Sequence, residues 1–507
     1  MSPRVKYDKW SVMQDVTKCH QGENIFKSIN MERRKLICLL ILFAVNLLNY
    51  MDRFTIAGVL NDVIKFYQID DKMAGFLQTV FIIFFMLFAP VCGFLGDRYN
   101  RKRIILIGEI VWVLAVFASS FVPHEHFYLF VLLRGIVGIG EASYAVVAPT
   151  FLADMFAGKT RSRVLMFFYF AIPVGSGLGY VIGSYVTSIA KAGRTDCLDC
   201  WQWGIRSTPI FGIITIIGLL IGVDEPVRGQ ADCEEINGQA ESDNLHRVNA
   251  LTNANDGMVT VTTSFKDKML NVSQDLIYLI KNQTFVWSTI AYTAVVFVTG
   301  TLTWWAPACI EEAIAWHKNI TNATAVTDTE HVSLTFGAIT CASGILGVAL
   351  GTIISMAWKR GIWIFTNYAN VRADALVSAI GSFLATPLAI IVPHRRGIAS
   401  AVQILISHAF GDASGPWIVG AISDSVRGDD KTPEAHFKSL VIAFYLPNVL
   451  LFVSGIAFLL AAYKLPTDLK KAEEWRKVPR TADTGNINDG LAPSNRLNQY
   501  QNDAFDP

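Results

Sequence analysis

Long runs of apolar residues are the feature that most constrains how this chain can fold. Eleven segments of about 20 residues are predominantly apolar, and a run of 18 or more such residues is typical of a membrane-spanning helix. Over the whole chain 52% of residues are apolar and 17% are charged, against roughly 25% charged in an average soluble protein. The sequence therefore excludes a soluble enzyme and predicts an all-α, polytopic membrane protein.

The predicted spans divide the chain into two bundles, a linker and two tails. The eleven spans are expected at 36–58, 73–95, 104–122, 127–152, 164–190, 206–223, 286–310, 332–357, 373–392, 399–422 and 439–463. We expect a cytoplasmic tail over 1–35, a six-helix bundle over 36–223, a cytoplasmic linker with an amphipathic segment over 224–284, a second bundle over 285–463 and a cytoplasmic-type tail over 464–507. Six spans followed by a linker and a second set indicate the duplicated halves of many secondary transporters, which bind substrate near the membrane midplane.

Basic residues predict the sidedness of the chain, because Lys and Arg gather in cytoplasmic loops. They cluster at 33–35, 98–103, 159–163 and 359–360, which places the N-terminus and the even-numbered loops inside. The loop after the seventh span then lies outside. It holds glycosylation acceptor sequences at Asn319 and Asn322, and we expect these two residues to be glycosylated.

The alternation of sides fails near the C-terminus. The basic residues 394–396 follow one span after those at 359–360, and the basic tail after residue 463 also has cytoplasmic character. The second bundle is therefore predicted to be one span short. Either the chain is a shortened form, or its late helices have an unusual orientation.

Charge and cysteine content exclude several partners. The 43 Lys and Arg residues balance 42 Asp and Glu residues, so the net charge of +1 argues against a nucleic-acid partner. Cys197 and Cys200 form the one C-x-x-C pair, without a second pair or a nearby His, so they are a candidate disulfide in an oxidising compartment rather than a zinc site. No cofactor and no metal are predicted, and we expect a monomer.

Two motifs resemble those of the major facilitator superfamily. The segment 93–102, GFLGDRYNRK, is similar to the superfamily's G-x-x-x-D-R-x-G-R-R/K signature between its second and third spans. Asn100 stands where glycine is usual, and asparagine also tolerates left-handed backbone. The segment 133–142 resembles the R-x-x-x-G-x-G pattern of the fourth span. We expect a conformational latch on the cytoplasmic side, formed by Asp97, Arg98, Arg101 and Arg134.

Three further segments resemble the spinster family, which transports lysophospholipids and sphingolipids. They are residues 49–60, 140–150 and 407–413. The family has twelve spans and carries its Val-Pro-x-Arg-Arg stretch after the tenth, whereas here residues 392–396 follow the ninth predicted span. The resemblance thus implies a two-bundle fold with about eleven spans, one fewer than in the family.

Four ionisable residues lie inside predicted spans, where each charge costs about 2.5–3.5 kcal/mol unless it faces a partner or a wet cavity. Arg134 and Glu141 are seven residues apart on one helix face, while the adjacent Asp52 and Arg53 point about 100° apart, so that one can face a cavity and the other a neighbouring helix. Arg53 is suited to a phosphate head group, and a desolvated Glu141 is suited to proton exchange. Asp52 is a further candidate, and the alternative is that it forms a structural ion-pair network with Arg134.

His408 and Asp412 lie four residues apart on one face of a late span, ahead of the helix-breaking pair Gly415 and Pro416. A histidine in a wet cavity titrates near neutral pH, so His408 is a candidate for coupling transport to protons. A structural histidine is the alternative.

We expect a secondary active transporter that moves a lysophospholipid or a sphingosine-phosphate-type lipid across the bilayer, coupled to protons, in the lysosomal, late endosomal or plasma membrane. Two alternatives stay open within transport: a proton-coupled carrier of small organic solutes, and a shortened form that associates with full-length copies and does not transport. A membrane-embedded lipid hydrolase using His408 and Asp412 is disfavoured, because the sequence lacks a G-x-S-x-G turn and a second intramembrane His.

Overall fold

The structure, a computed structural model, is helical over the parts that it describes. These parts are residues 25–192, 197–226, 228, 277, 279–318, 329–360, 402–403 and 405–477. Ten of the eleven predicted spans fall on described helices, and the all-α prediction is confirmed for them. The span expected at 373–392, and both Asn319 and Asn322, lie outside the described residues.

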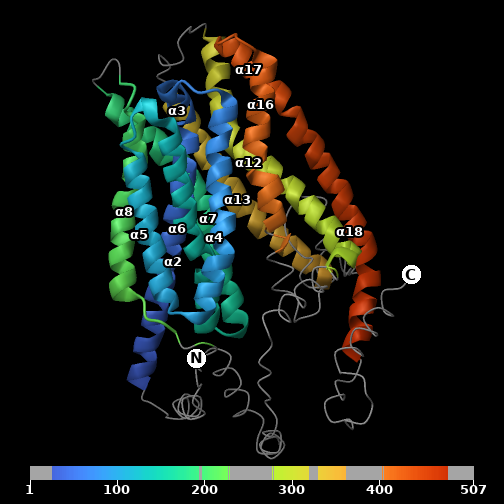
Figure 1. Ribbon diagram of the computed structural model, residues 1–507. Helices are drawn as coiled ribbons and strands as arrows, with labels where there is room; N and C mark the ends of the chain where they lie inside the picture. Colours follow the sequence, from blue (N-terminus) through green and yellow to red (C-terminus); the bar gives the residue numbers. More distant parts are fainter. Residues whose placement is uncertain are drawn as a thin grey trace, which may run out of the picture. The chain divides into compact units, whose positions relative to one another are not determined.

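The chain divides into two compact units, drawn together in Figure 1. Unit 1 comprises residues 1–68, 83–260 and 327–344, and unit 2 comprises residues 69–82, 261–326 and 345–507. The helices of unit 1 are α2 (Ile25–Gly58), α3 (Leu60–Tyr67), α5 (Arg101–Ser119), α6 (Phe127–Met155), α7 (Gly158–Lys191) and α8 (Trp201–Gly222). Those of unit 2 are α12 (Gln283–His317), η6 (His408–Asp412), α16 (Gly415–Arg427), α17 (Pro433–Ala443) and α18 (Tyr445–Lys477). Helices α4 (Asp71–Arg98) and α13 (Thr329–Arg360) contribute residues to both units.

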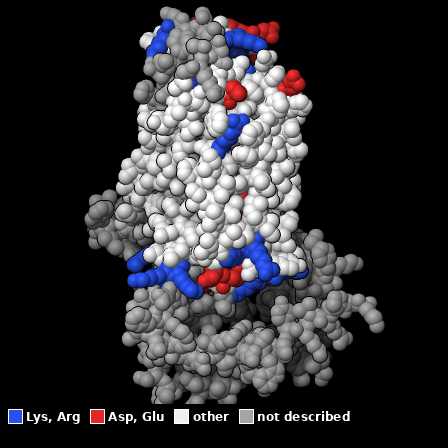
Figure 2. Space-filling view, turned by 90° about the vertical axis from the view of Figure 1, so that its left-hand side faces the viewer, with Lys and Arg blue, Asp and Glu red and all other residues white. Residues whose placement is uncertain are grey.

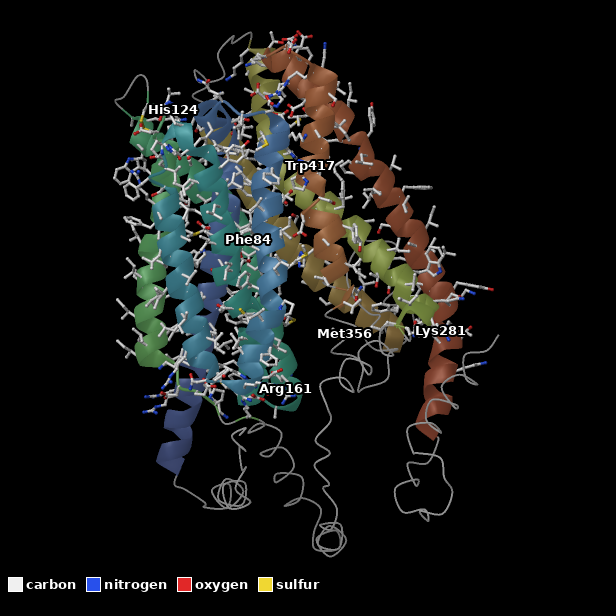
Figure 3. All side chains as sticks on the ribbon, in the orientation of Figure 1. Phe84, His124, Arg161, Lys281, Met356 and Trp417 are labelled. Atoms are coloured by element: carbon white, nitrogen blue, oxygen red, sulfur yellow. A yellow bond between two sulfur atoms is a disulfide. The ribbon has the colours of Figure 1, made fainter. Side chains whose placement is uncertain are left out.

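Seven of the described helical segments are long and apolar enough to cross a membrane. Figure 2 shows one face of the molecule, on which nearly all charged side chains gather at the two ends and a broad uncharged band lies between them. In unit 1, His124 and Arg161 lie at opposite ends (Figure 3). This distribution is the one that a hydrocarbon core flanked by two aqueous phases requires.

Close contact between α2 and α7 organises unit 1. Glycines at four-residue spacing on α7 face the backbone of α2, and a Cβ built on Gly175 would lie 2.5 Å from the Leu47 carbonyl oxygen. A Cβ on Gly183 would lie 2.7 Å from the Thr55 oxygen. Small residues permit such backbone contact where the surrounding lipid is as apolar as the helices themselves.

Asn100 does not adopt the left-handed backbone that we considered for this turn. Its φ of −66° and ψ of 116° are extended, and its side chain accepts a hydrogen bond of 2.9 Å from the backbone N–H of Arg103. Asparagine therefore serves here as the N-cap of α5, a position at which its side-chain oxygen is favoured over glycine.

Helix directions in unit 2 follow from contacts at the two ends of α12. At its start, the backbone N–H of Thr284 donates to Asp468 of α18 at 2.9 Å. Near its end, Glu312 lies 3.4 Å from Nδ1 of His436 in the first turn of α17. The late part of α18 therefore lies at the end of unit 2 where α12 begins, next to the linker that the charge pattern predicts to be cytoplasmic.

Candidate functional site

Two ion pairs join α2 to α6 inside unit 1. Nη2 of Arg53 lies 3.2 Å from Oε1 of Glu141, and the two side chains are 10% and 5% exposed. Nη2 of Arg134 lies 3.1 Å from Oδ2 of Asp52, and these side chains are 4% and 1% exposed. The four intramembrane charges singled out in the sequence thus pair with one another.

Asp52 and Arg53 are neighbours on α2, yet both contact α6. Their partners Arg134 and Glu141 are seven residues apart, about 10 Å along the helix axis. Each pair contains one arginine, and its long side chain is able to span part of this distance along the helix axis. Both neighbours thus bind the same helix, and that one of them faces a cavity stays a prediction.

The surroundings of the two pairs differ. Asp52 also accepts a hydrogen bond of 2.8 Å from the Thr208 hydroxyl of α8, so this carboxylate is held by two helices. The Arg53 guanidinium lies 5.5 Å from the ring centre of Tyr50. Asn49, one turn before Arg53, is buried, and neither its side-chain oxygen nor its nitrogen has a hydrogen-bond partner among the described residues. Among the described residues, polar atoms without a hydrogen-bond partner therefore lie beside both pairs: the side-chain amide of Asn49 near Arg53, and Nη1 of Arg134 in the other pair.

Glu109 on α5 is a buried carboxyl that the sequence reading missed, although its position inside the span expected at 104–122 was a signal of the same kind. It is 1% exposed, and it accepts a hydrogen bond of 3.1 Å from the Thr215 hydroxyl. A carboxyl buried beside a hydroxyl is costly to ionise, so Glu109 is a second group of unit 1 suited to holding a proton.

Of the four residues of the predicted conformational latch, Asp97, Arg98 and Arg101 lie at the turn between α4 and α5, whereas Arg134 lies within α6. Arg101 pairs with Asp154 of α6, and Arg134 lies in the buried pair with Asp52. The Arg98 guanidinium lies 3.9 Å from the ring centre of Phe94 on its own helix. The described contacts do not include an ion pair between Asp97 and Arg98.

Glu225 and Arg228, which follow α8, bind the turn between α4 and α5. Arg228 donates to the backbone oxygens of Gly96 at 2.9 Å and Tyr99 at 3.0 Å, and also to that of Asp97. The Glu225 carboxylate accepts the backbone N–H groups of Arg101 and Lys102, at 2.9 and 2.7 Å, at the start of α5. A carboxylate at a helix N-terminus is stabilised by the free N–H groups and the helix dipole.

His408 and Asp412 contact each other in unit 2, with Nδ1 2.8 Å from Oδ1, in the π-helical turn η6. Gly300 of α12 leaves the room for this turn, because a Cβ there would lie 2.6 Å from Cβ of Asp412. The His408 side chain is 27% exposed, so it is the more accessible member of the pair.

Unit 2 also contains an apolar pocket of about 680 Å³. It is lined by Leu279, Ile280, Phe285, Val286, Thr289, Ile290, Thr293, Ala294, Phe297, Val402, Ile406, Phe410, Leu450 and Val453. Only two of these residues are polar, and the buried Thr289 hydroxyl has no hydrogen-bond partner in the described parts. The volume is within the range of small-molecule sites.

A group of charged residues, here named the end cluster, joins four helices of unit 2 and was also missed. It consists of Asp71, Glu312, Asp424, Arg427 and His436. Asp71 is fully buried, with Nε2 of His436 at 3.0 Å and Nη1 of Arg427 at 3.4 Å. All five lie near predicted span ends, where a charge is ordinarily solvated, so no sequence signal distinguished them.

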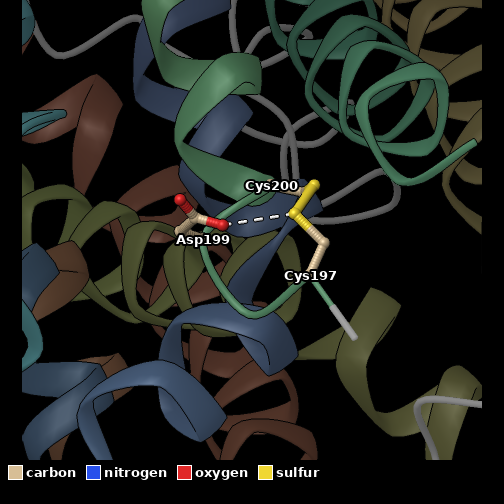
Figure 4. A group of neighbouring side chains, drawn as sticks. All are labelled: Cys197, Asp199 and Cys200. Carbon is tan, nitrogen blue, oxygen red and sulfur yellow. Dashed lines mark hydrogen bonds between the residues drawn. A yellow bond between two sulfur atoms is a disulfide. The ribbon is translucent and has the colours of Figure 1, made fainter. Parts of the chain in front are cut away.

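Cys197 and Cys200 form a disulfide in the loop before α8 (Figure 4). Asp199 lies beside them, with Oδ1 3.2 Å from Sγ of Cys197. Because both sulfurs are bonded to each other, this group has no thiolate to offer a metal.

Comparison with known proteins defines first the class and then the family. The model of the Major Facilitator Superfamily matches residues 42–392, which shows that the chain is a member of that superfamily. Protein spinster homolog 1 of Homo sapiens is 37% identical over 480 residues, covering 87% of this chain and 83% of that protein. The sphingosine-1-phosphate transporter of Xenopus tropicalis is 35% identical over 502 residues, covering 91% and 88%. The chain belongs to the spinster family.

A solved structure agrees on the fold. The crystal structure of a bacterial homologue of the human lysosomal transporter spinster, in an inward-facing and occupied conformation, matches with a TM-score of 0.63 and 17% identity, covering 88% of this chain and 99% of that one. The chain is thus a multi-pass integral membrane transporter of the major facilitator type, and not an enzyme.

Proposed function

We propose that this protein moves a lysophospholipid or a sphingosine-phosphate-type lipid across the lysosomal, late endosomal or plasma membrane by alternating access, coupled to protons. The observation that carries the proposal is the buried Arg53–Glu141 pair, at 3.2 Å. Lipid transport is also what the name of the Xenopus tropicalis relative specifies for that protein.

The Arg53–Glu141 pair supplies both a phosphate-binding group and a proton-exchanging group. When Glu141 takes up a proton it loses its charge, and the Arg53 guanidinium is released to bind a phosphate oxygen in its place. Arginine presents several donors in a fixed fork that matches phosphate geometry. The unused amide of Asn49, on the same helix face one turn earlier, offers a further hydrogen bond to the head group.

The apolar pocket of unit 2 is suited to a hydrocarbon chain. Its lining is almost entirely aliphatic and aromatic, and Ala294 is its smallest side chain. We expect Ala294→Phe to shorten the longest chain that is transported efficiently, because the added ring fills part of the pocket. Ala313→Phe on the same helix, outside the pocket lining, is the matched control. An unchanged chain-length profile in Ala294→Phe would remove this pocket from the substrate path.

The central experiment is transport by purified protein in liposomes with a pH gradient. Lysophosphatidylcholine and sphingosine 1-phosphate, each radiolabelled, are the test cargoes, and an uncharged sugar tests the small-solute alternative. Glu141→Gln is expected to reduce lipid transport at least tenfold and to abolish its dependence on the gradient. Glu125→Gln, at an exposed side chain near the start of α6, is the control.

Three outcomes contradict parts of the proposal. Unchanged lipid transport in Glu141→Gln would exclude this carboxyl from coupling. Competition by the sugar but not by the lipids would favour the carrier of small solutes. Failure of the unsubstituted protein to transport any cargo, together with its co-purification with a full-length relative, would favour the non-transporting form.

A further inference from the structure

The end cluster contains a histidine whose two ring nitrogens both face carboxylates. Nε2 of His436 lies 3.0 Å from Oδ2 of Asp71, and Nδ1 lies 3.4 Å from Oε1 of Glu312. A neutral imidazole carries one N–H, so one of these contacts would set a nitrogen lone pair against a carboxylate oxygen. An imidazolium has an N–H at both positions, and this form alone makes both contacts attractive.

The remaining charges of the cluster favour the same protonation state. Arg427 contacts Asp71 at 3.4 Å and Asp424 at 2.8 Å. Three carboxylates with one arginine leave two negative charges, which a proton on His436 reduces to one. Since Asp71 is fully buried and His436 is 7% exposed, water compensates little of this excess.

Neighbouring ionisable groups already have other partners. The Lys72 ammonium lies 5.6 Å from the ring centre of Trp417, and Lys438 pairs with Glu434 at 2.5 Å. In the loop between α16 and α17, the backbone N–H of Thr432 donates to Asp430 and holds the pKa of that carboxyl below its usual range. Asp430 therefore stays ionised near neutral pH and does not titrate there.

The cluster fixes the first turn of α4. The Asp424 carboxylate accepts the backbone N–H groups of Asp71 at 3.1 Å and Lys72 at 2.7 Å, and the Ser423 hydroxyl donates to Asp71 at 2.8 Å. His436 belongs to α17. Its Nε2 contacts Asp71 of α4, and its Nδ1 contacts Glu312 of α12. His436 thus connects the start of α4 to two further helices, and both of its contacts are attractive only in the protonated form.

We propose that His436 is a proton-binding site, separate from the buried pairs of unit 1, whose bound proton joins the start of α4 to α12 and α17. Loss of the proton makes one of the two imidazole contacts repulsive, which weakens the hold of α12 and α17 on this turn of α4 while the contacts from α16 remain. The cluster lies at the end of α12 that precedes the predicted outer loop, so the proton is exchanged with the outer or lumenal phase. This inference does not depend on the identity of the cargo.

Nitrogen NMR of protein labelled with ¹⁵N-histidine tests the proton directly, because the imidazolium and the two neutral tautomers give different ¹⁵N shifts. At about pH 7.5, where an ordinary exposed histidine has lost its proton, one imidazolium signal is expected to persist and to be absent from His436→Gln. Glu312→Gln should shift its titration to lower pH, and the matched control Glu434→Gln on α17 should not. A His436 signal that titrates in the pH range ordinary for exposed histidine, or that shows a neutral tautomer at both pH 6 and pH 7.5, overturns the proposal.

Cysteine labelling tests the link to α4. Ala74 is fully buried one turn after Asp71, and Ala74→Cys is placed in a background where the six cysteines other than Cys197 and Cys200 are replaced by alanine. The labelling rate with a membrane-impermeant maleimide is divided by the rate of an exposed Glu125→Cys reporter, because this division cancels the pH dependence of thiol reactivity. We expect the resulting relative rate of Ala74→Cys to be at least tenfold higher at about pH 9 than at pH 6. His436→Gln should give the fast relative rate at both pH values. Equal relative rates at both pH values in the unsubstituted background would contradict the joining role.

Discussion

In unit 1 each buried arginine faces one carboxylate, whereas in the end cluster of unit 2 three carboxylates surround one arginine and one histidine. The pairs of unit 1 are balanced without any further proton. In the end cluster, a proton on His436 reduces the excess of negative charge. Burial therefore has different consequences in the two regions: it makes the pairs of unit 1 sensitive to loss of a partner, and it makes the end cluster sensitive to pH.

The largest effect on stability is expected where a balanced pair loses one member. Arg134→Ala leaves the Asp52 carboxylate buried with the Thr208 hydroxyl as its described partner, and removal of one member of a buried ion pair costs about 3–5 kcal/mol. The midpoint of thermal unfolding in detergent measures the loss. The double variant Asp52→Leu with Arg134→Met should recover most of it, and a loss that the double variant does not recover would show that Arg134 acts through packing.

A smaller effect is expected in the end cluster, where each charge has several neighbours. Asp71→Ala removes one carboxylate, but Glu312 stays beside His436 and Asp424 stays beside Arg427, so we expect a loss of about 1–3 kcal/mol. The midpoint of thermal unfolding in detergent measures this loss as well. Asp70→Ala, at the exposed residue before Asp71, is the control. A loss as large as that of Arg134→Ala would remove the proposed difference between the regions.

The smallest effect is expected at Glu109. If this buried carboxyl carries a proton, Glu109→Gln preserves an oxygen that accepts from Thr215 and changes no charge, so unfolding should shift by less than about 0.5 kcal/mol. Glu109→Lys at the same site provides a variant with a buried charge. Destabilisation of several kcal/mol by the glutamine variant would show that Glu109 is ionised and has a cationic partner.

The sequence identified four of the buried ionisable residues in the middle of the spans, but neither Glu109 nor the way in which the four pair. Asp52, Arg53, Arg134 and Glu141 are conspicuous because an ionisable group deep in a span is costly. Their pairing depends on the relative position of α2 and α6 along the helix axes. No local sequence pattern encodes this position. The roles of Arg53 and Glu141 in binding and coupling stay predictions.

Charges near span ends could not be recognised in the same way. Asp71 follows a polar Gln-Ile-Asp stretch, and His436 follows the Thr432–Pro433 helix start, so each has the local sequence of an ordinary solvated helix end. Only the folding of four helices of unit 2 onto one another buries them. The glycine contacts of α7, by contrast, were foreseeable, because small residues at four-residue spacing fall on one helix face.

Gly75 on α4 and Gly420 on α16 meet backbone rather than side chains: a Cβ on Gly75 would overlap the Pro416 carbonyl, and one on Gly420 would overlap the carbonyl of Asp71. Neither backbone carbonyl can rotate away as a side chain does. Replacement by Ala, then Ser, then Val would accordingly widen the separation of these two helices in graded steps while every ionisable group is kept. Such a series would let spacing and charge be varied independently, so that a mechanical contribution to the transport cycle could be measured apart from an electrostatic one.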